Sequence, residues 1–250
     1  MKKYRLHIFI FLIATTGIFP YIYSQKQIPQ NLPKLDQQPA HFGYSLGLNT
    51  MDFIIRPSDN FLLNTFDTVY AVEVGKYIGF NLNMISNLRL TDQLSVRFLP
   101  GLIFGQRNLN YKIKRNNEYR LHSMMIESTF IDLPIYLKYK AVRINNWRPF
   151  VLAGVSPRID LAAQRKIRPE EMPKIRLKNF DSYYEVGLGL DFFLEYFMFG
   201  IELKGSWGVF NIVRYDNTQF SDVYRRLNSR MLILSFHFEG GKLDKIKWWD

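Results

Sequence analysis

Two of the four histidines in this chain could meet in the folded protein and do chemistry together. His41 lies in the first and His237 in the last of the β-strand patterns described below, and the first and last strands of a closed barrel pair. Two neighbouring imidazoles could hold a metal ion or form a catalytic dyad. A simpler arrangement, which we expect, is an interior hydrogen-bonded pair near one end of the barrel.

His122 and Ser123 are the second candidate for chemistry, because a serine nucleophile needs a positioned base. They are neighbours in a stretch that we expect to be a long, solvated loop, which would give them no fixed geometry. The sequence also shows no HExxH motif, no glycine-rich phosphate loop and no metal-ligand spacing. We therefore predict that the protein is not an enzyme and has no catalytic residues, no cofactor and no bound metal.

The first 24 residues have the pattern of a secretory signal peptide. Lys2, Lys3 and Arg5 precede an apolar run from Ile8 to Ala14, and the small residue Ser24 ends the segment. The alternative, an uncleaved anchor helix, would need about 20 apolar residues, more than this run offers. We expect an exported protein, and because the chain contains no cysteine it has no disulfides.

The segment HFGYSLGLNTMDF, residues 41–53, alternates large apolar side chains with glycine, serine and asparagine. A period of two is typical of a β-strand with one apolar face and one small or polar face. The connections between such segments alternate long and short, as in up-and-down outer-membrane barrels with long external loops and short periplasmic turns. We expect eight strands, near residues 41–53, 76–87, 94–107, 128–140, 148–161, 184–192, 199–207 and 232–238.

The charged side chains of these strands share a face with the glycines and serines. A soluble lipocalin-like barrel would leave those charges in water, whereas an outer-membrane barrel turns them into a narrow lumen, where they pair. Aromatic residues near the strand ends favour the membrane barrel, because aromatic girdles lie at membrane interfaces. The residues expected to face the lumen are Arg97, Asp132, Lys138, Lys140, Glu185, Asp191, Glu202 and Lys204, and the girdle aromatics are Tyr139, Phe192, Phe199, Trp207 and Phe238.

The predicted fold class is all-β: an eight-stranded antiparallel up-and-down outer-membrane β-barrel. After residue 24 no charge-free apolar run could span a membrane as a helix, and a closed barrel is the other structure that satisfies every backbone group in lipid. We expect a signal peptide (1–24), an extended periplasmic lead-in (25–40), the barrel (41–239) and a periplasmic tail (240–250). Both ends of the mature chain would then be periplasmic.

Two parts of the sequence resemble known outer-membrane barrels. FIDLPIYLKYK (130–140), followed by RPFVLAGV (148–155), resembles two strands of small barrels common in Bacteroidetes. LPKLDQQPAHFGYSLGLNTMDF (32–53), with its HFG, LGLN and MDF, resembles the PorT/SprT-type family of the type IX secretion system. That resemblance implies a non-enzymatic component that supports export of C-terminally tagged cargo, including motility adhesins in gliding relatives. The tail GGKLDKIKWWD departs from barrels that end on an aromatic residue of the last strand.

Basic loops and the tail supply the candidate partner contacts: Arg165, Lys166, Arg168, Trp248 and Trp249. The basic loop 165–178 could bind phosphorylated lipopolysaccharide or an acidic partner, or could simply be solvated. The tail could dock on a partner, lie at the inner-leaflet interface, or fray. We expect outer-membrane lipid and other type IX secretion proteins as partners, lipopolysaccharide as a further one, and no nucleic acid.

The expected size of the lumen limits the role in export. Eight strands enclose only enough space for their own side chains, so the barrel would not be the conduit for folded cargo. A secretion role would therefore be auxiliary and would depend on contacts with other components. The alternative is a general structural or surface-ligand-binding outer-membrane barrel unrelated to secretion.

Overall fold

The computed structural model describes residues 29–59, 69–115, 118–163, 175–215, 221 and 223–240. The predicted signal peptide, most of the basic loop and the tail after residue 240 lie outside the described residues. In the described ranges, no helix is long and apolar enough to cross a membrane.

Antiparallel strands make up most of the described chain, and one 3-10 helix, η1 (Leu35–Gln37), precedes them. In chain order the strands are β1 (Ala40–Pro57), β2 (Val69–Lys76), β3 (Ile78–Arg89), β4 (Leu94–Phe98), β5 (Gly101–Arg115), β6 (Glu118–Asp132), β7 (Ile135–Lys140), β8 (Trp147–Asp160), β9 (Arg176–Leu177), β10 (Phe180–Phe193), β11 (Met198–Gly208), β12 (Val213–Arg214) and β13 (Tyr224–Gly240).

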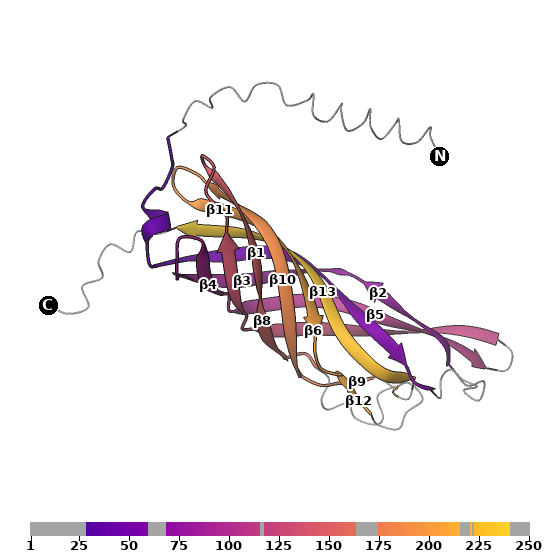
Figure 1. Ribbon diagram of the computed structural model, residues 1–250. Coiled ribbons are helices and arrows are strands. Elements are labelled where there is room, and N and C mark those ends of the chain that lie inside the picture. The colour runs from indigo at the N-terminus through magenta and orange to yellow at the C-terminus, as the bar shows by residue number, and fades with distance from the viewer. Residues whose placement is uncertain are drawn as a thin grey trace, which may run out of the picture.

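Eleven of these strands form one sheet that closes as a ring of eight chain segments. Three segments are each split in two: β2/β3 at Tyr77, β4/β5 at Leu99–Pro100 and β6/β7 at Leu133–Pro134. Proline interrupts the last two because it has no N–H for the ladder. The segments follow chain order around the ring, and β13 pairs with β1 to close it (Figure 1). The predicted eight-stranded antiparallel up-and-down barrel is confirmed.

Apolar side chains point outward from this barrel and charged ones point inward, the reverse of a soluble protein. On β10, Leu188 is 62% exposed, whereas Glu185 and Asp191 are buried. An exposed apolar belt on a closed barrel suits lipid, because a sheet that closes on itself has no unpaired edge strand. Each residue predicted to face the lumen is buried: Arg97, Asp132, Lys138, Lys140, Glu185, Asp191, Glu202 and Lys204.

The apolar belt stops before the strands do at the end away from the described termini. On the outward face of β5, Phe104 is followed by the polar Gln106, yet the β5–β6 ladder continues to Arg115 opposite Glu118. This hairpin therefore extends beyond the belt, and Figure 1 shows β5 and β6 running on at this end of the barrel. The expectation of a long loop over residues 108–126 is wrong, because backbone pairing continues beyond the lipid-facing zone.

The lead-in is not simply extended in its described part. Residues 35–37 form η1, and Leu35 is buried against Phe193 and Met198 at the barrel end that carries the short turns. The side chain of Asn31 donates a hydrogen bond to the carbonyl oxygen of Phe193 at 3.0 Å. The expectation of an extended lead-in is corrected here, because burial of Leu35 favours a compact turn over the end of the barrel.

Candidate functional site

The lumen near the described termini holds a group of buried charges centred on Arg97. Its Nη2 donates to Glu239 Oε1 at 2.6 Å, and its Nη1 lies 3.5 Å from Glu202 Oε2. Beside this group, Lys138 Nζ lies 2.8 Å from Asp191 Oδ2. The inward face of the barrel alternates the two signs of charge across the lumen, which is how a buried charge becomes tolerable.

The two histidines predicted to pair with each other pair instead with two glutamates. His41 Nε2 lies 2.8 Å from Glu239 Oε2, and His237 Nε2 lies 3.0 Å from Glu202 Oε2. Both rings are interior and near one barrel end, as predicted. The predicted direct hydrogen bond is wrong, because the register of β1 against β13 places His237 opposite Ser45, four residues along β1 from His41.

A second charged layer lies farther from the termini. Arg158 Nε donates to Asp132 Oδ1 at 2.8 Å, and its Nη2 pairs with Glu185. Lys204 Nζ connects the layers, since it lies 3.6 Å from Glu185 and 3.3 Å from Glu202. Ion pairs thus run without a break from Arg97 through Glu202, Lys204 and Glu185 to Arg158.

Apolar side chains close the lumen beyond this network. Gly105 illustrates how tightly they pack, because a Cβ atom at this position would come within 2.5 Å of Met51. The interior of the described barrel is therefore a packed core, as eight strands allow, and not a pore. The closing layer consists of Met51, Ile103, Phe130, Tyr183, Met231 and Ile233.

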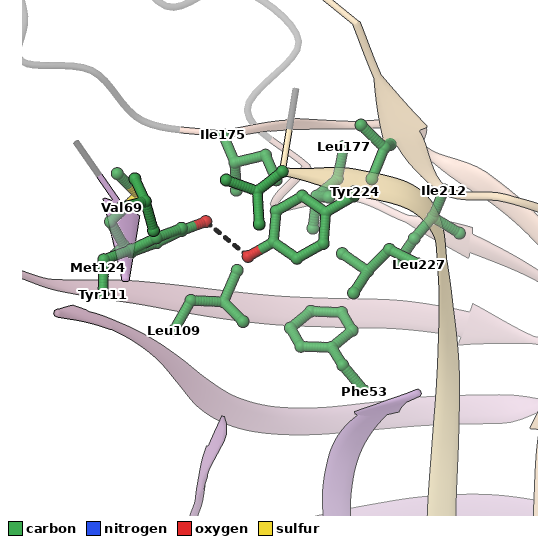
Figure 2. Close-up of a cluster of buried hydrophobic side chains, with 12 residues drawn as sticks. Phe53, Val69, Leu109, Tyr111, Met124, Ile175, Leu177, Ile212, Tyr224 and Leu227 are labelled. Carbon is green, nitrogen blue, oxygen red and sulfur yellow. Dashed lines mark hydrogen bonds between the residues drawn. The ribbon is translucent and has the colours of Figure 1, made fainter. Parts of the chain in front are cut away.

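A larger apolar cluster lies at the end beyond the belt, where β1, β5, β6 and β13 meet β9 and β12. Figure 2 shows Tyr224 reaching across it toward Tyr111, whose Oη accepts a hydrogen bond at 2.7 Å. The cluster ties the extended strands and the β9–β12 pair into one body. Its buried members are Phe53, Val69, Leu109, Tyr111, Met124, Ile175, Leu177, Ile212, Val213, Val223, Tyr224 and Leu227.

Burial in this cluster, outside the lipid-facing part of the strands, raises the pKa of Tyr111 to about 12. Burial and the neighbouring Tyr111 also raise the pKa of Tyr224. The pKa of a tyrosine in an unfolded chain is about 10. The two tyrosines therefore contribute their full stabilisation at pH values below the pKa of the unfolded state. That stabilisation is lost as the pH rises through the higher pKa of the folded state.

Raising the pH from about 8 to above about 11 should loosen this outer cluster, because ionisation of the tyrosines favours the opened state. We expect limited proteolysis of the β5–β6 hairpin, measured on the protein in detergent, to accelerate over that range. The double variant Tyr111→Phe/Tyr224→Phe cannot ionise there and should lose the acceleration. The same pH dependence in the double variant would contradict this account.

His122 and Ser123 do not form a nucleophile–base pair. Both lie on β6, where successive side chains point to opposite faces. His122 lies opposite Tyr111 on the inward side and is half-buried, while the Ser123 hydroxyl donates to Asn110 Oδ1 at 2.7 Å on the other side. The prediction of a solvated loop histidine is wrong. No group of three or more metal-ligating side chains occurs among the described residues.

Further lumenal charges escaped the sequence reasoning, namely Arg107, Arg148, Arg158, Asp160, Asp181 and Glu239. Arg107 is buried, donates to Ser229 Oγ at 2.9 Å and lies 3.9 Å from the ring centre of Phe53. Arg158 could have been predicted to face the lumen, because it lies on the inward side of the alternating pattern of β8. Arg107 and Glu239 follow the same alternation in their strands. They were missed because both lie at the limits of the strands that the sequence predicted.

The residues predicted to contact partners lie outside the described residues. These are Arg165, Lys166 and Arg168 in the basic loop and Trp248 and Trp249 in the tail. Lys178, which ends the basic loop, is described and exposed, and its backbone N–H donates to the carbonyl of Ile212 at 2.8 Å.

The sequence matches the family model described as outer membrane protein beta-barrel domain over residues 24–214. No curated protein matches the chain. Solved structures that are similar to it include the following three. Neisserial surface protein A is 9% identical (TM-score 0.41, 80% of this chain and 99% of that chain covered). AlkL in lipid bilayers is 12% identical (0.45, 91% and 100%), and the N-terminal β-barrel domain of Pseudomonas aeruginosa OprF is 13% identical (0.39, 81% and 98%).

Proposed function

Because the chain belongs to the outer membrane protein beta-barrel domain family, we propose that it supports type IX protein secretion as a non-enzymatic outer-membrane barrel. Its cargo would be C-terminally tagged proteins, with gliding-motility adhesins among them. The resemblance of residues 32–53 to the PorT/SprT-type family supports this role. The observation that supports an auxiliary role is the filled lumen, in which charges pair and an apolar layer closes the interior. A barrel filled in this way would not itself be the conduit for cargo.

The proposed orientation places both ends of the mature chain in the periplasm, after removal of a signal peptide. Short turns at the end near β1 and β13 and the long β5–β6 hairpin at the other end support it, since outer-membrane barrels have short periplasmic turns. The apolar cluster beyond the belt would then stand outside the cell.

Function would reside in surfaces offered to partners. Outside, the basic loop around Arg165, Lys166 and Arg168 would meet an acidic secretion protein or lipopolysaccharide through charge complementarity. In the periplasm, the tail with Trp248 and Trp249 would anchor another component, since buried tryptophans dominate many interfaces. The alternative is a general structural or ligand-binding barrel, for which loss of these surfaces would leave export unchanged.

The proposal is tested by cargo secretion in variants of the full chain. Truncation after Gly241 should leave a heat-modifiable barrel, because the last strand ends at Gly240. Secretion should nevertheless fall by about tenfold or more if the two tryptophans are central contacts. Charge reversal at Arg165, Lys166 and Arg168 should weaken the outer contact, more strongly at low ionic strength.

Ser206→Ala is the matched interior control, because it removes a lumenal hydroxyl that accepts a hydrogen bond from Arg158 at 3.2 Å without emptying the lumen. Its secretion should stay at the level of the unmodified protein. If export survived loss of all the contact surfaces while deletion of the gene left the secreted proteins unchanged, the general structural role would replace the proposal.

A further inference from the structure

Two arginines face each other directly across the seam that closes the barrel. Arg56 on β1 is the register partner of Arg226 on β13, at the end beyond the apolar belt. Directly opposed residues on antiparallel strands have Cβ atoms about 5 Å apart, and like charges there are destabilising. Both side chains lie on the outward face, in the same alternation as Arg230 and the belt residue Leu232.

Nothing in the described part of the chain neutralises this pair. Arg226 Nη2 donates to the carbonyl oxygen of Val209 at 2.5 Å, and its Nε is buried without a hydrogen-bond partner. Arg56 is exposed, and no described carboxylate lies within ion-pair distance of it. A buried guanidinium donor with no acceptor beside a second cation is the arrangement that an anion would complete.

Two more cations lie one step closer to the belt. Arg230 Nε and Lys76 Nζ approach the same oxygen of Asp52, at 2.7 and 3.0 Å. The side chains of Arg230 and Lys76 remain 48% and 53% exposed. We call Arg56, Lys76, Arg226 and Arg230 the cationic column. Asp52 is the one carboxylate paired within it among the described residues, so positive charge is in excess.

The cationic column continues the lipid-facing surface. Leu232 follows Arg230 on the same outward face of β13, and Leu48 lies on the same face of β1, two residues beyond Thr50, the register partner of Leu232. Leu48 and Leu232 are each about half exposed. Apolar side chains with a row of cations directly beyond them match an amphiphile whose acyl chains lie in the belt and whose phosphates lie at its edge. An acidic protein would need the cations but not this continuity with the belt.

We propose that the cationic column binds the phosphate groups of a phosphorylated glycolipid of the outer leaflet. Arg230 and Arg226 are four residues apart on one strand, about 13 Å, so the column can meet two phosphates at different depths. Arg56 and Arg226 form the outer phosphate site, and Arg230 and Lys76 form the inner one. The leaflet rests on the orientation proposed above, but the site itself does not depend on a role in secretion.

The probe is diphosphorylated lipid A in phosphatidylcholine nanodiscs that hold the purified full chain, compared with lipid A whose phosphates have been removed. Native mass spectrometry counts the bound lipid, and the heat-modifiability midpoint reports any lipid-dependent stabilisation. Arg56→Gln/Arg226→Gln should weaken lipid A binding by about 25-fold, at roughly fivefold per arginine. The dephosphorylated lipid should bind no better to the unmodified chain than to this variant.

Lys112→Gln is the matched control, because Lys112 is a cation at the same end whose Nζ already pairs with Glu73 at 2.5 Å. It should leave lipid A binding unchanged. Arg56→Glu replaces the repulsive pair by an attractive one, so it should raise the midpoint in lipid-A-free nanodiscs and abolish the lipid A shift. That opposite response separates ligand binding from a folding defect.

Three results would overturn the proposal. The double variant could retain lipid A as well as the unmodified chain does, or the dephosphorylated lipid could bind the unmodified chain as well as lipid A does. An acidic peptide could also displace lipid A from the column as effectively as added lipid A does. The third would assign the column to an acidic protein. The nanodisc assay involves no secretion partner, so its failure would leave the export proposal standing. Conversely, if the variants of the cationic column lost lipid A binding but still exported cargo normally, the lipid site would be separate from the secretion role.

Discussion

Arg97→Met should destabilise the barrel by about 3–5 kcal/mol, because it leaves buried carboxylates without their cation. Arg97 is fully buried between Glu239 and Glu202, which also hold His41 and His237. Methionine fills a similar volume, so lost packing contributes little. The measurement is urea unfolding in lipid vesicles, followed by the heat-modifiable band shift on gels.

The control for this variant restores the charge balance. Arg97→Met combined with Glu239→Gln removes one charge of each sign and should recover part of the lost stability, a coupling that a double-mutant cycle measures. Lys112→Gln, at an exposed pair, should cost less than about 1 kcal/mol. Equal losses for Arg97→Met and Lys112→Gln would contradict the view that the lumenal network holds the barrel together.

Leu188→Arg should cost about 2–4 kcal/mol and impair assembly in outer membranes, because it places a charge in the middle of the lipid-facing belt. Leu188 lies on β10 between Val151 and Leu203 on the neighbouring strands, which face the same way. Fractionation of cell envelopes and heat-modifiability of the extracted protein measure the effect.

Leu121→Arg is the matched control, since it makes the same change on the exposed outward side of β6, beyond the belt. The cost of an arginine falls to about 0–1 kcal/mol near the interfaces, so this variant should assemble normally. If Leu188→Arg assembled as well as Leu121→Arg, the belt would be wrongly placed.

The sequence alone determined the strand pattern, the number of segments and the side of each strand that carries charge. Alternation with a period of two is local, so HFGYSLGLNTMDF and the segment around Leu188 reveal their faces without any knowledge of neighbours. The short turns were equally readable. The strand extensions beyond the belt were not, because polar residues replace apolar ones on the outward face there and the alternation fades.

The tertiary structure decided which charges meet. Arg97 and Glu239 are 142 residues apart, and His41 and His237 exchanged their expected mutual bond for bonds to two glutamates. The opposition of Arg56 and Arg226 likewise depends on the register of β1 against β13. Register across the closing seam is fixed by the tilt and stagger of all eight segments together, and a shift of one residue would turn every partner to the other face. No single strand carries that information, so the pairs could be known only once the barrel was closed.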